Sequence, residues 1–306
     1  MRQSYPKESL RVLCALFGYT RQAYYEADLH YVKTSIANVI VLTLVKEMRQ
    51  EIPILGTRKL LFLLSNEIKR HGIKLGRDKL FDLLRFHGLL IRRRKRMIKT
   101  TDSHHWLKKY PNLIKELVIS CPEQLWVSDI TYIRTLQGFS YLSMLTDAYS
   151  RKIVGYALYE TLEALGPLEA LRIALRERKK NTPFILIHHS DRGIQYCCAE
   201  YIDILRAEKI AISMTQNGSP YDNALAERIN GTIKNDFFPK RIYKDHNQAS
   251  EEISRIIIKY NQLRPHDSID YLTPQQAHEK AGPIKKRWKN YYKLKKQKEQ
   301  SMKNDD

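Results

Sequence analysis

An acidic residue within an apolar strand is the first position whose chemistry stands out. Asp129 lies in the short β-rich stretch 126–133, where strand alternation puts it on one face with Val127, Thr131 and Ile133. A carboxylate on the apolar face of a central strand is costly unless it is paired with a cation or binds a metal ion. We therefore expect Asp129 to have such a partner.

A second acid follows a run of apolar residues. Residues 184–187 are expected to form a fully buried strand, and Asp191 comes just beyond it, beside Ser190 and Gly193. The carboxyl ends of strands are where α/β sheets keep their ligand sites. If this strand lies beside the one that carries Asp129, the two carboxyl groups come close together.

The third acid, Glu227, lies in an expected helix. Residues 217–220 have the composition of a turn, and either Ser219 or Asp222 is placed to cap the helix that follows. Pro220 falls near the start of this helix, where a missing N–H costs little. A helix packed against the same edge of the sheet would bring Glu227 to the two aspartates.

Three converging carboxylates suit a hard divalent cation. Hard divalent cations prefer oxygen ligands, and Mg²⁺ keeps water molecules that a substrate can replace. Two such ions, about 3.5–4 Å apart, would activate an attacking hydroxyl and stabilise the leaving oxygen of a phosphodiester. The residues therefore predict a metal site formed by Asp129, Asp191 and Glu227, which would hold two Mg²⁺ ions as cofactor.

The pattern of residues 125–240 favours an α/β fold. Three strands that meander, followed by alternating helix and strand, predict a mixed five-stranded sheet with flanking helices. Strands are expected at residues 126–133, 139–148, 152–159, 184–187 and 210–215, and helices at residues 165–179 and 198–208, before the helix with Glu227.

Residues 1–90 are expected to be helical throughout. The expected helices are two within residues 1–30 separated by a break at Gly18, then 36–50, 57–70 with Thr57 as N-cap, and 77–87. Helix, glycine turn, threonine cap and helix is the order of a helix-turn-helix, although a plain helical hairpin gives the same pattern. Arg77, Lys79 and Arg85 are left for the outer face of the last helix, where they either contact DNA or form a solvated surface.

The charge distribution predicts a polyanionic partner. The chain has 53 Lys and Arg against 33 Asp and Glu, and its net charge of +20 is divided into +14 for residues 1–120, zero for 121–280 and +6 for 281–306. This excess favours nucleic acid over a membrane surface. Five consecutive cations cannot pack in a core, so they are expected either to contact phosphate or to form a basic linker; they are Arg92, Arg93, Arg94, Lys95 and Arg96.

Membrane insertion, secretion and a structural zinc site are not expected. No apolar run reaches the ~18 residues of a membrane span, and no signal peptide is evident. The four cysteines form no CxxC pair and suit a reducing compartment. We therefore expect a cytoplasmic protein.

Three motifs together resemble a known family of enzymes. They are W-x-x-D-I-T-Y at residues 126–132, H-S-D-R-G-x-Q-Y at 189–196 and N-G-x-P-x-D-N-A-x-A-E at 217–227. In combination they closely resemble the DDE transposases of bacterial insertion sequences, in particular the OrfB product of the insertion sequence three family. As in that family, thirty-five residues, 192–226, separate the second Asp from the Glu. A later block, YNQLRPHDSI at residues 260–269, also matches, and the resemblance covers about residues 35–280.

The resemblance implies a ribonuclease-H-like integrase core that binds Mg²⁺ or Mn²⁺ and carries out cleavage at transposon ends and DNA strand transfer. It assigns Asp129, Asp191 and Glu227 as the catalytic triad. Its partners would be double-stranded DNA (terminal inverted repeats and target), an upstream OrfA-type product and further copies of the chain on DNA. The chain itself lacks an evident leucine zipper. Two other functions stay open: a catalytically inactive DNA-binding regulator of transposition, and a ribonuclease-H-like nuclease or resolvase without strand joining.

The expected domains are a helical helix-turn-helix region at 1–110 with a basic linker at 91–110, the catalytic core at 121–240, a helical extension at 241–280 and a basic tail at 281–306. Four further positions near the core have more than one expected role. Asp147 is read as structural or as support for a metal ligand, in preference to being a metal ligand itself, and His189 as either structural or site-orienting. Lys234, on the face of Glu227, is either a phosphate contact or a solvated lysine. Arg264 either contacts DNA or fixes a turn.

Overall fold

The computed structural model describes residues 7–91, 107–178, 184–216, 223–238, 242–280 and 282–285. The chain forms two compact units. The first consists of Met1–Glu51 and Leu55–Arg93, and the second of Ile52–Ile54 and Arg94–Asp306. No helix in the described ranges is long and apolar enough to cross a bilayer.

The first unit is all helical, as expected. It contains α1 (Leu10–Leu16), α2 (Arg21–Glu51), α3 (Thr57–Arg70) and α4 (Arg77–Phe86). The side chain of Ser9 caps α1, and the hydroxyl of Thr20 accepts a hydrogen bond from the Ala23 backbone N–H at 3.0 Å, so the expected turn and threonine cap are present. Apolar side chains of α2, α3 and α4 form its buried core: Val41, Val45, Leu60, Leu64, Leu80 and Leu84.

Two boundaries predicted in this unit are wrong. The expected separate helix at residues 36–50 is the second half of α2, which runs unbroken from Arg21 to Glu51 because no Gly or Pro interrupts it. The N-cap of α3 is Gly56, and Thr57 is instead its first helical residue with a buried side chain.

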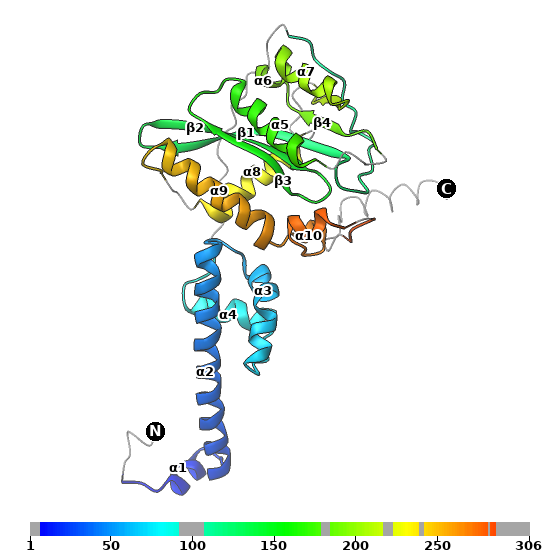
Figure 1. The fold of residues 1–306 in the computed structure, drawn as a ribbon. Coiled ribbons are helices and arrows are strands. Elements are labelled where there is room, and N and C mark those ends of the chain that lie inside the picture. The colour runs from blue at the N-terminus through cyan, green and yellow to red at the C-terminus, as the bar shows by residue number, and fades with distance from the viewer. Residues whose placement is uncertain are drawn as a thin grey trace, which may run out of the picture. The chain divides into compact units, whose positions relative to one another are not determined.

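The second unit is built on a five-stranded sheet (Figure 1). Its strands are β1 (Leu125–Thr135), β2 (Gly138–Asp147), β3 (Ile153–Tyr159), β4 (Ile187–Ser190) and β5 (Ala211–Met214). They lie in the order β3-β2-β1-β4-β5. β1, β2 and β3 pair antiparallel, while β1–β4 and β4–β5 pair parallel. This arrangement confirms the expected mixed sheet of a ribonuclease-H-like fold.

Helices cover both faces of this sheet (Figure 1). Trp126 of β1 lies in the larger core with α5 (Leu165–Glu177) and α7 (Ala199–Ala207). The alternate residue, Val127, packs on the opposite face with Ala226 of α8 (Ala224–Phe237). The remaining helices are α6 (Ile194–Cys197), α9 (His246–Leu263), the 3₁₀ turn η1 (Asp267–Ile269) and α10 (Pro274–His278).

Two predictions for the second unit are wrong in position. The fourth strand is Ile187–Ser190 and not residues 184–187, and Phe184 and Ile185 are exposed. The apolar run marks the approach to the strand, whereas pairing with β1 and β5 starts only at Ile187. The helix that carries Glu227 also starts later than expected, because its N-cap residue is Asn223; the predicted caps Ser219 and Asp222 lie outside the described residues.

The contact between β3 and α5 leaves no room for a side chain at Gly155. A Cβ atom there would lie 2.1 Å from the Ala170 carbonyl oxygen and 3.0 Å from the Ala174 Cβ. We expect Gly155→Ala to lower the free energy of unfolding by about 1–3 kcal/mol, because the helix must move off the strand. Denaturant unfolding followed by circular dichroism measures this change.

Gly231→Ala is the matched control, because the same added methyl group meets nothing closer than Asn235 Nδ2 at 3.9 Å. This helical position should keep or gain stability, by up to about 1 kcal/mol. Equal stability of Gly155→Ala and the wild-type chain would contradict the close packing of α5 on β3.

Candidate active site

The pairing of β1 with β4 brings two of the predicted acids together. The parallel ladder matches Trp126 with His188 and Val127 with His189. Two residues further along each chain stand Asp129 and Asp191. Because both chains run toward the same edge of the sheet, the aspartates emerge side by side at the carboxyl end of β4.

Helix α8 brings Glu227 to the same edge. At its start, the Asn223 side-chain amide donates a hydrogen bond of 3.1 Å to the backbone carbonyl of Ser128. One turn after Glu227, the Asn230 amide donates to Asp129 Oδ2 at 2.6 Å. These two contacts hold α8 against β1 on either side of Glu227, so its carboxylate lies close enough for its charge to act on Asp129.

The three acids interact electrostatically. Burial, the largest effect, together with the negative charges of Asp191 and Glu227 raises the pKa of Asp129 to about 7. The hydrogen bonds from Asn230 and from the Ile130 N–H favour the ionised form but do not compensate. The structure therefore concentrates negative charge at one point, at a cost that a bound cation would remove.

The donor set fits a hard divalent cation, but the acids are not preassembled around one. Among the described residues, no group of three or more His, Cys, Asp or Glu side chains is arranged to hold a metal ion. Both carboxylate oxygens of Asp129 accept hydrogen bonds from the protein, and Asp191 Oδ1 accepts one from the Gly193 N–H at 3.0 Å. These hydrogen bonds orient the two carboxylates, and each of these oxygens keeps a second lone pair that a cation can use.

Asn230 is a site residue that the sequence interpretation missed. It is buried, and its short hydrogen bond fixes the orientation of Asp129. The signal that could have found it is its position three residues after Glu227, which puts both side chains on one face of α8.

Lys234 lies on the same helix, one turn beyond Asn230, and is partly buried. Burial lowers the pKa of its ammonium group, while the negative charge of Asp129 opposes this effect. The lysine therefore lies within the field of the acidic cluster, although its predicted contact with phosphate stays a prediction.

His189 is a structural residue. It is fully buried, and its Nδ1 lies 2.8 Å from the hydroxyl of Ser213 on β5. This contact links the two parallel strands, which supports the structural interpretation, while the site-orienting role stays a prediction.

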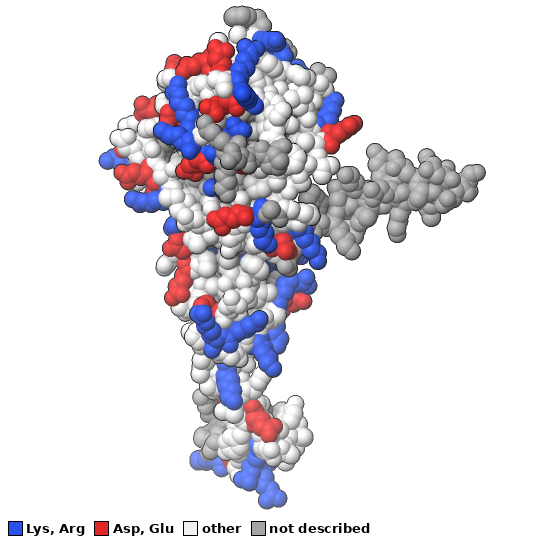
Figure 2. All heavy atoms as spheres, turned by 45° about the vertical axis from the view of Figure 1, so that its right-hand side comes forward, with Lys and Arg blue, Asp and Glu red and all other residues white. Residues whose placement is uncertain are grey.

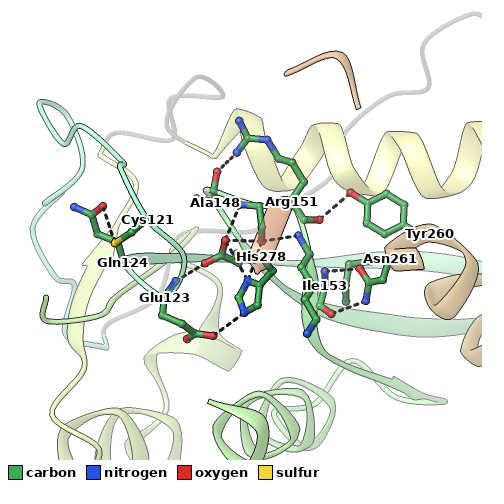
Figure 3. Close-up of polar contacts among 12 residues, drawn as sticks. Cys121, Glu123, Gln124, Ala148, Arg151, Ile153, Tyr260, Asn261 and His278 are labelled. Carbon is green, nitrogen blue, oxygen red and sulfur yellow. Dashed lines mark hydrogen bonds and ion pairs between the residues drawn. The ribbon is translucent and has the colours of Figure 1, made fainter. Parts of the chain in front are cut away.

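Asp147 is structural as well. Its carboxylate is fully buried and accepts hydrogen bonds from the Glu123 N–H and from both the N–H and the hydroxyl of Ser150. The imidazole of His278 on α10 lies against it and contacts Glu123 at 3.3 Å (Figure 3). Burial alone would lower the pKa of His278, but the contacts with Asp147 and Glu123 outweigh it and raise the pKa.

The block at residues 260–269 holds the C-terminal helices on the sheet (Figure 3). Asn261 pairs with both backbone groups of Ile153 at 3.0 Å, which covers the start of the edge strand β3. Tyr260 donates to the Arg151 carbonyl. The buried guanidinium of Arg264 forms a 2.7 Å ion pair with Asp236, so its structural interpretation is confirmed.

The basic residues predicted on α4 are exposed, as expected. Arg77 pairs with Asp78 at 2.8 Å and Arg85 pairs with Asp82, so two of the three cations have acidic neighbours on the same helix. On the face drawn in Figure 2, Lys and Arg are interspersed with Asp and Glu. DNA contact by Arg77, Lys79 and Arg85 stays a prediction.

Several predictions fall on residues outside the described ranges. These are the basic run 92–96, the turn 217–222 before α8 and the basic tail from residue 286 onward.

Comparison with known proteins identifies the second unit. Two models, both described as integrase core domain, match residues 120–220 and 208–274. An uncharacterized 31 kDa protein of insertion element IS600 from Shigella sonnei is 34% identical over 273 residues, which cover 88% of this chain and 98% of that protein.

Two further relatives are transposases by name. The transposase of insertion sequence element IS629 from Shigella sonnei is 32% identical over 69% of this chain and 70% of its own length. Transposase InsF of insertion sequence IS3fB from Escherichia coli (strain K12) is 31% identical over 70% of this chain and 74% of its own length.

The pKa of Asp129 gives a prediction for the metal-free protein. A carboxyl group whose pKa is about 7 when folded and near 4 when unfolded destabilises the fold as the pH rises from about 4 to 7. Asp129→Asn removes this effect and keeps an amide that fits the space. At pH 8 the variant should unfold with a free energy about 1–3 kcal/mol higher than the wild type, and this gain should shrink at pH 5.5.

Denaturant unfolding at the two pH values in the presence of a chelator measures the difference. Glu251→Gln, an exposed carboxyl on α9, is the control and should show no such pH-dependent gain. If Asp129→Asn is less stable than wild type at both pH values, the three acids do not repel one another as described.

Proposed function

The chain belongs to the insertion sequence three family of transposases and functions in DNA transposition, and on that premise we propose that Asp129, Asp191 and Glu227 are its catalytic residues. The observation that carries this proposal is the meeting of the three acids at the carboxyl edge of the sheet, where burial and mutual repulsion raise the pKa of Asp129 to about 7.

The proposed reaction is cleavage at the ends of the element, followed by attack of the freed 3′-hydroxyl on target DNA. Asp129, Asp191 and Glu227 would hold Mg²⁺ or Mn²⁺ through their carboxylate oxygens. When bound, two such cations supply activation of the attacking hydroxyl and charge stabilisation of the leaving oxygen. The oxygen-only donor set and the unbalanced negative charge support this assignment.

The neighbouring side chains of the protein position these groups. Asn230 holds the Asp129 carboxylate in one orientation through its 2.6 Å hydrogen bond. Asn223 fixes the start of α8 to β1, which limits the movement of Glu227. Lys234, within the field of the acids, is placed to bind the phosphate next to the scissile bond.

The proposed partners follow from this reaction. Terminal inverted repeats and target DNA are the substrates. Arg77, Lys79 and Arg85 of α4 and the basic run at residues 92–96 are proposed to contact DNA, the latter through phosphate without regard to sequence. Because two element ends must be joined to one target, the active form contains at least two copies of the chain, and an OrfA-type product of the same element is the proposed further partner.

Removing the charge of Glu227 tests the catalytic assignment. We expect Glu227→Gln to lower end cleavage and strand transfer by at least about 1,000-fold while DNA binding stays at the wild-type level, since the fold and the basic residues are unchanged. The measurement is cleavage and joining of labelled terminal-repeat DNA with Mg²⁺ or Mn²⁺, with binding followed on the same DNA.

The matched control is Glu251→Gln, which should be fully active. If wild type and Glu227→Gln bind DNA and are equally inactive, the chain is a DNA-binding regulator. If cleavage occurs without joined products, it is a nuclease of the same fold.

The metal assignment has a test that does not depend on activity. Mg²⁺ or Mn²⁺ should raise the unfolding temperature of the wild type, because a ligand that binds only the folded state stabilises it by mass action, by about 2.7 kcal/mol at 100 times its Kd. Asp129→Asn and Asp191→Asn should each lose this response, whereas Glu251→Gln should keep it. A response that survives both aspartate changes would place the metal elsewhere.

A further inference from the structure

An exposed apolar stripe runs along the first part of α2. It consists of Tyr25, Leu29, Val32, Ile36 and Val39, whose exposed fractions are 55%, 57%, 46%, 56% and 62%. Five large apolar side chains that stay about half exposed along one helix are unusual for a surface that faces only water.

The stripe lies on the side of α2 that does not pack against α3 and α4 of the same unit. At 3.6 residues per turn, Val41 and Val45, the buried residues of this helix, point to roughly the opposite side from Leu29 and Ile36. The core formed with α3 and α4 therefore does not account for the stripe.

The spacing of the stripe is that of a coiled coil. Its members follow one another at intervals of four, three, four and three residues, which places Leu29 and Ile36 at heptad positions a and Tyr25, Val32 and Val39 at positions d. A repeat of this kind buries its side chains only against a second helix with the same period.

The charged residues beside the stripe indicate what that second helix is. Arg21 and Asp28 occupy g positions, and Glu26 and Lys33 occupy the e positions five residues after them. In a parallel, in-register pair of identical helices, each g residue faces the following e residue of the other copy. Arg21 then meets Glu26 and Asp28 meets Lys33, so both pairs join opposite charges.

We propose that α2 forms a parallel two-stranded coiled coil with α2 of a second copy of this chain. Both the apolar stripe and the charged e and g residues are complementary to the same residues of a second copy, as a two-fold symmetric contact requires. The stripe contains no Lys or Arg, so it offers no binding group for a DNA phosphate. The pairing holds two N-terminal units together, and it stands independently of the catalytic assignment.

The proposed dimer is tested in the full-length chain by analytical ultracentrifugation over a range of concentrations. The wild type should dimerise, and Leu29→Asp with Ile36→Asp should raise the dissociation constant of the dimer at least about 100-fold, because each change places two carboxylates in an apolar layer. Both side chains are exposed in the single chain, so its circular dichroism should not change. Tyr31→Asp is the control, since Tyr31 is exposed on α2 but does not belong to the stripe.

The orientation is tested by charge exchange. Asp28→Lys and Lys33→Asp should each weaken the dimer by about 3–10-fold, because each puts like charges opposite one another, and the double variant should regain wild-type affinity. In an antiparallel pair these residues do not face each other, and the double variant would not recover.

A cross-link gives a second measure of orientation. Under mild oxidation, Tyr25→Cys should form a disulfide-linked dimer, because a parallel pair places the two copies of residue 25 side by side. The wild-type chain with its four cysteines and Tyr31→Cys are the controls. A wild type that stays monomeric, a dimer unaffected by the Leu29 and Ile36 changes, or assembly only with an OrfA-type product would each overturn the proposal.

Discussion

The parallel pairing of β1 with β4 is the constraint on which the candidate active site depends. Asp129 and Asp191 are 62 residues apart in the chain, and they meet only because Val127 is in register with His189. A shift of one residue in this register would turn one of the two carboxylates to the opposite face. Glu227, the third acid, lies on a helix and not on a strand. The side chains of Asn223 and Asn230 hold that helix, α8, against β1.

The charge of Asp129 is compensated less well than the charges of two other buried groups of the second unit, Asp147 and Arg264. Asp147 accepts three hydrogen bonds and lies against His278, and Arg264 is paired with Asp236. These contacts satisfy the charges within the protein and hold the C-terminal helices on the sheet. Asp129 has two hydrogen bonds and two acidic neighbours, so its negative charge is less well compensated than that of Asp147.

Most of the fold could be predicted from local patterns, and the errors have identifiable causes. Strands β1, β2 and β3 were predicted within one or two residues because apolar alternation and turn residues mark them. The fourth strand was misplaced because the apolar run at residues 184–187 cannot reveal where its neighbours begin to pair. The continuity of α2 was not predicted. The heptad spacing of the stripe was therefore missed as well, since the residues of the stripe were divided between two expected helices.

The sequence by itself determined the class of the protein and its mixed five-stranded sheet, and it predicted the three acids, because these depend on residue types and short-range periodicity. The tertiary structure alone decided that Asn230 holds Asp129 and that Arg264 and Asp147 are structural. Those facts depend on which residues distant in the chain come into contact, and a contact of this kind leaves no periodic pattern in a single sequence.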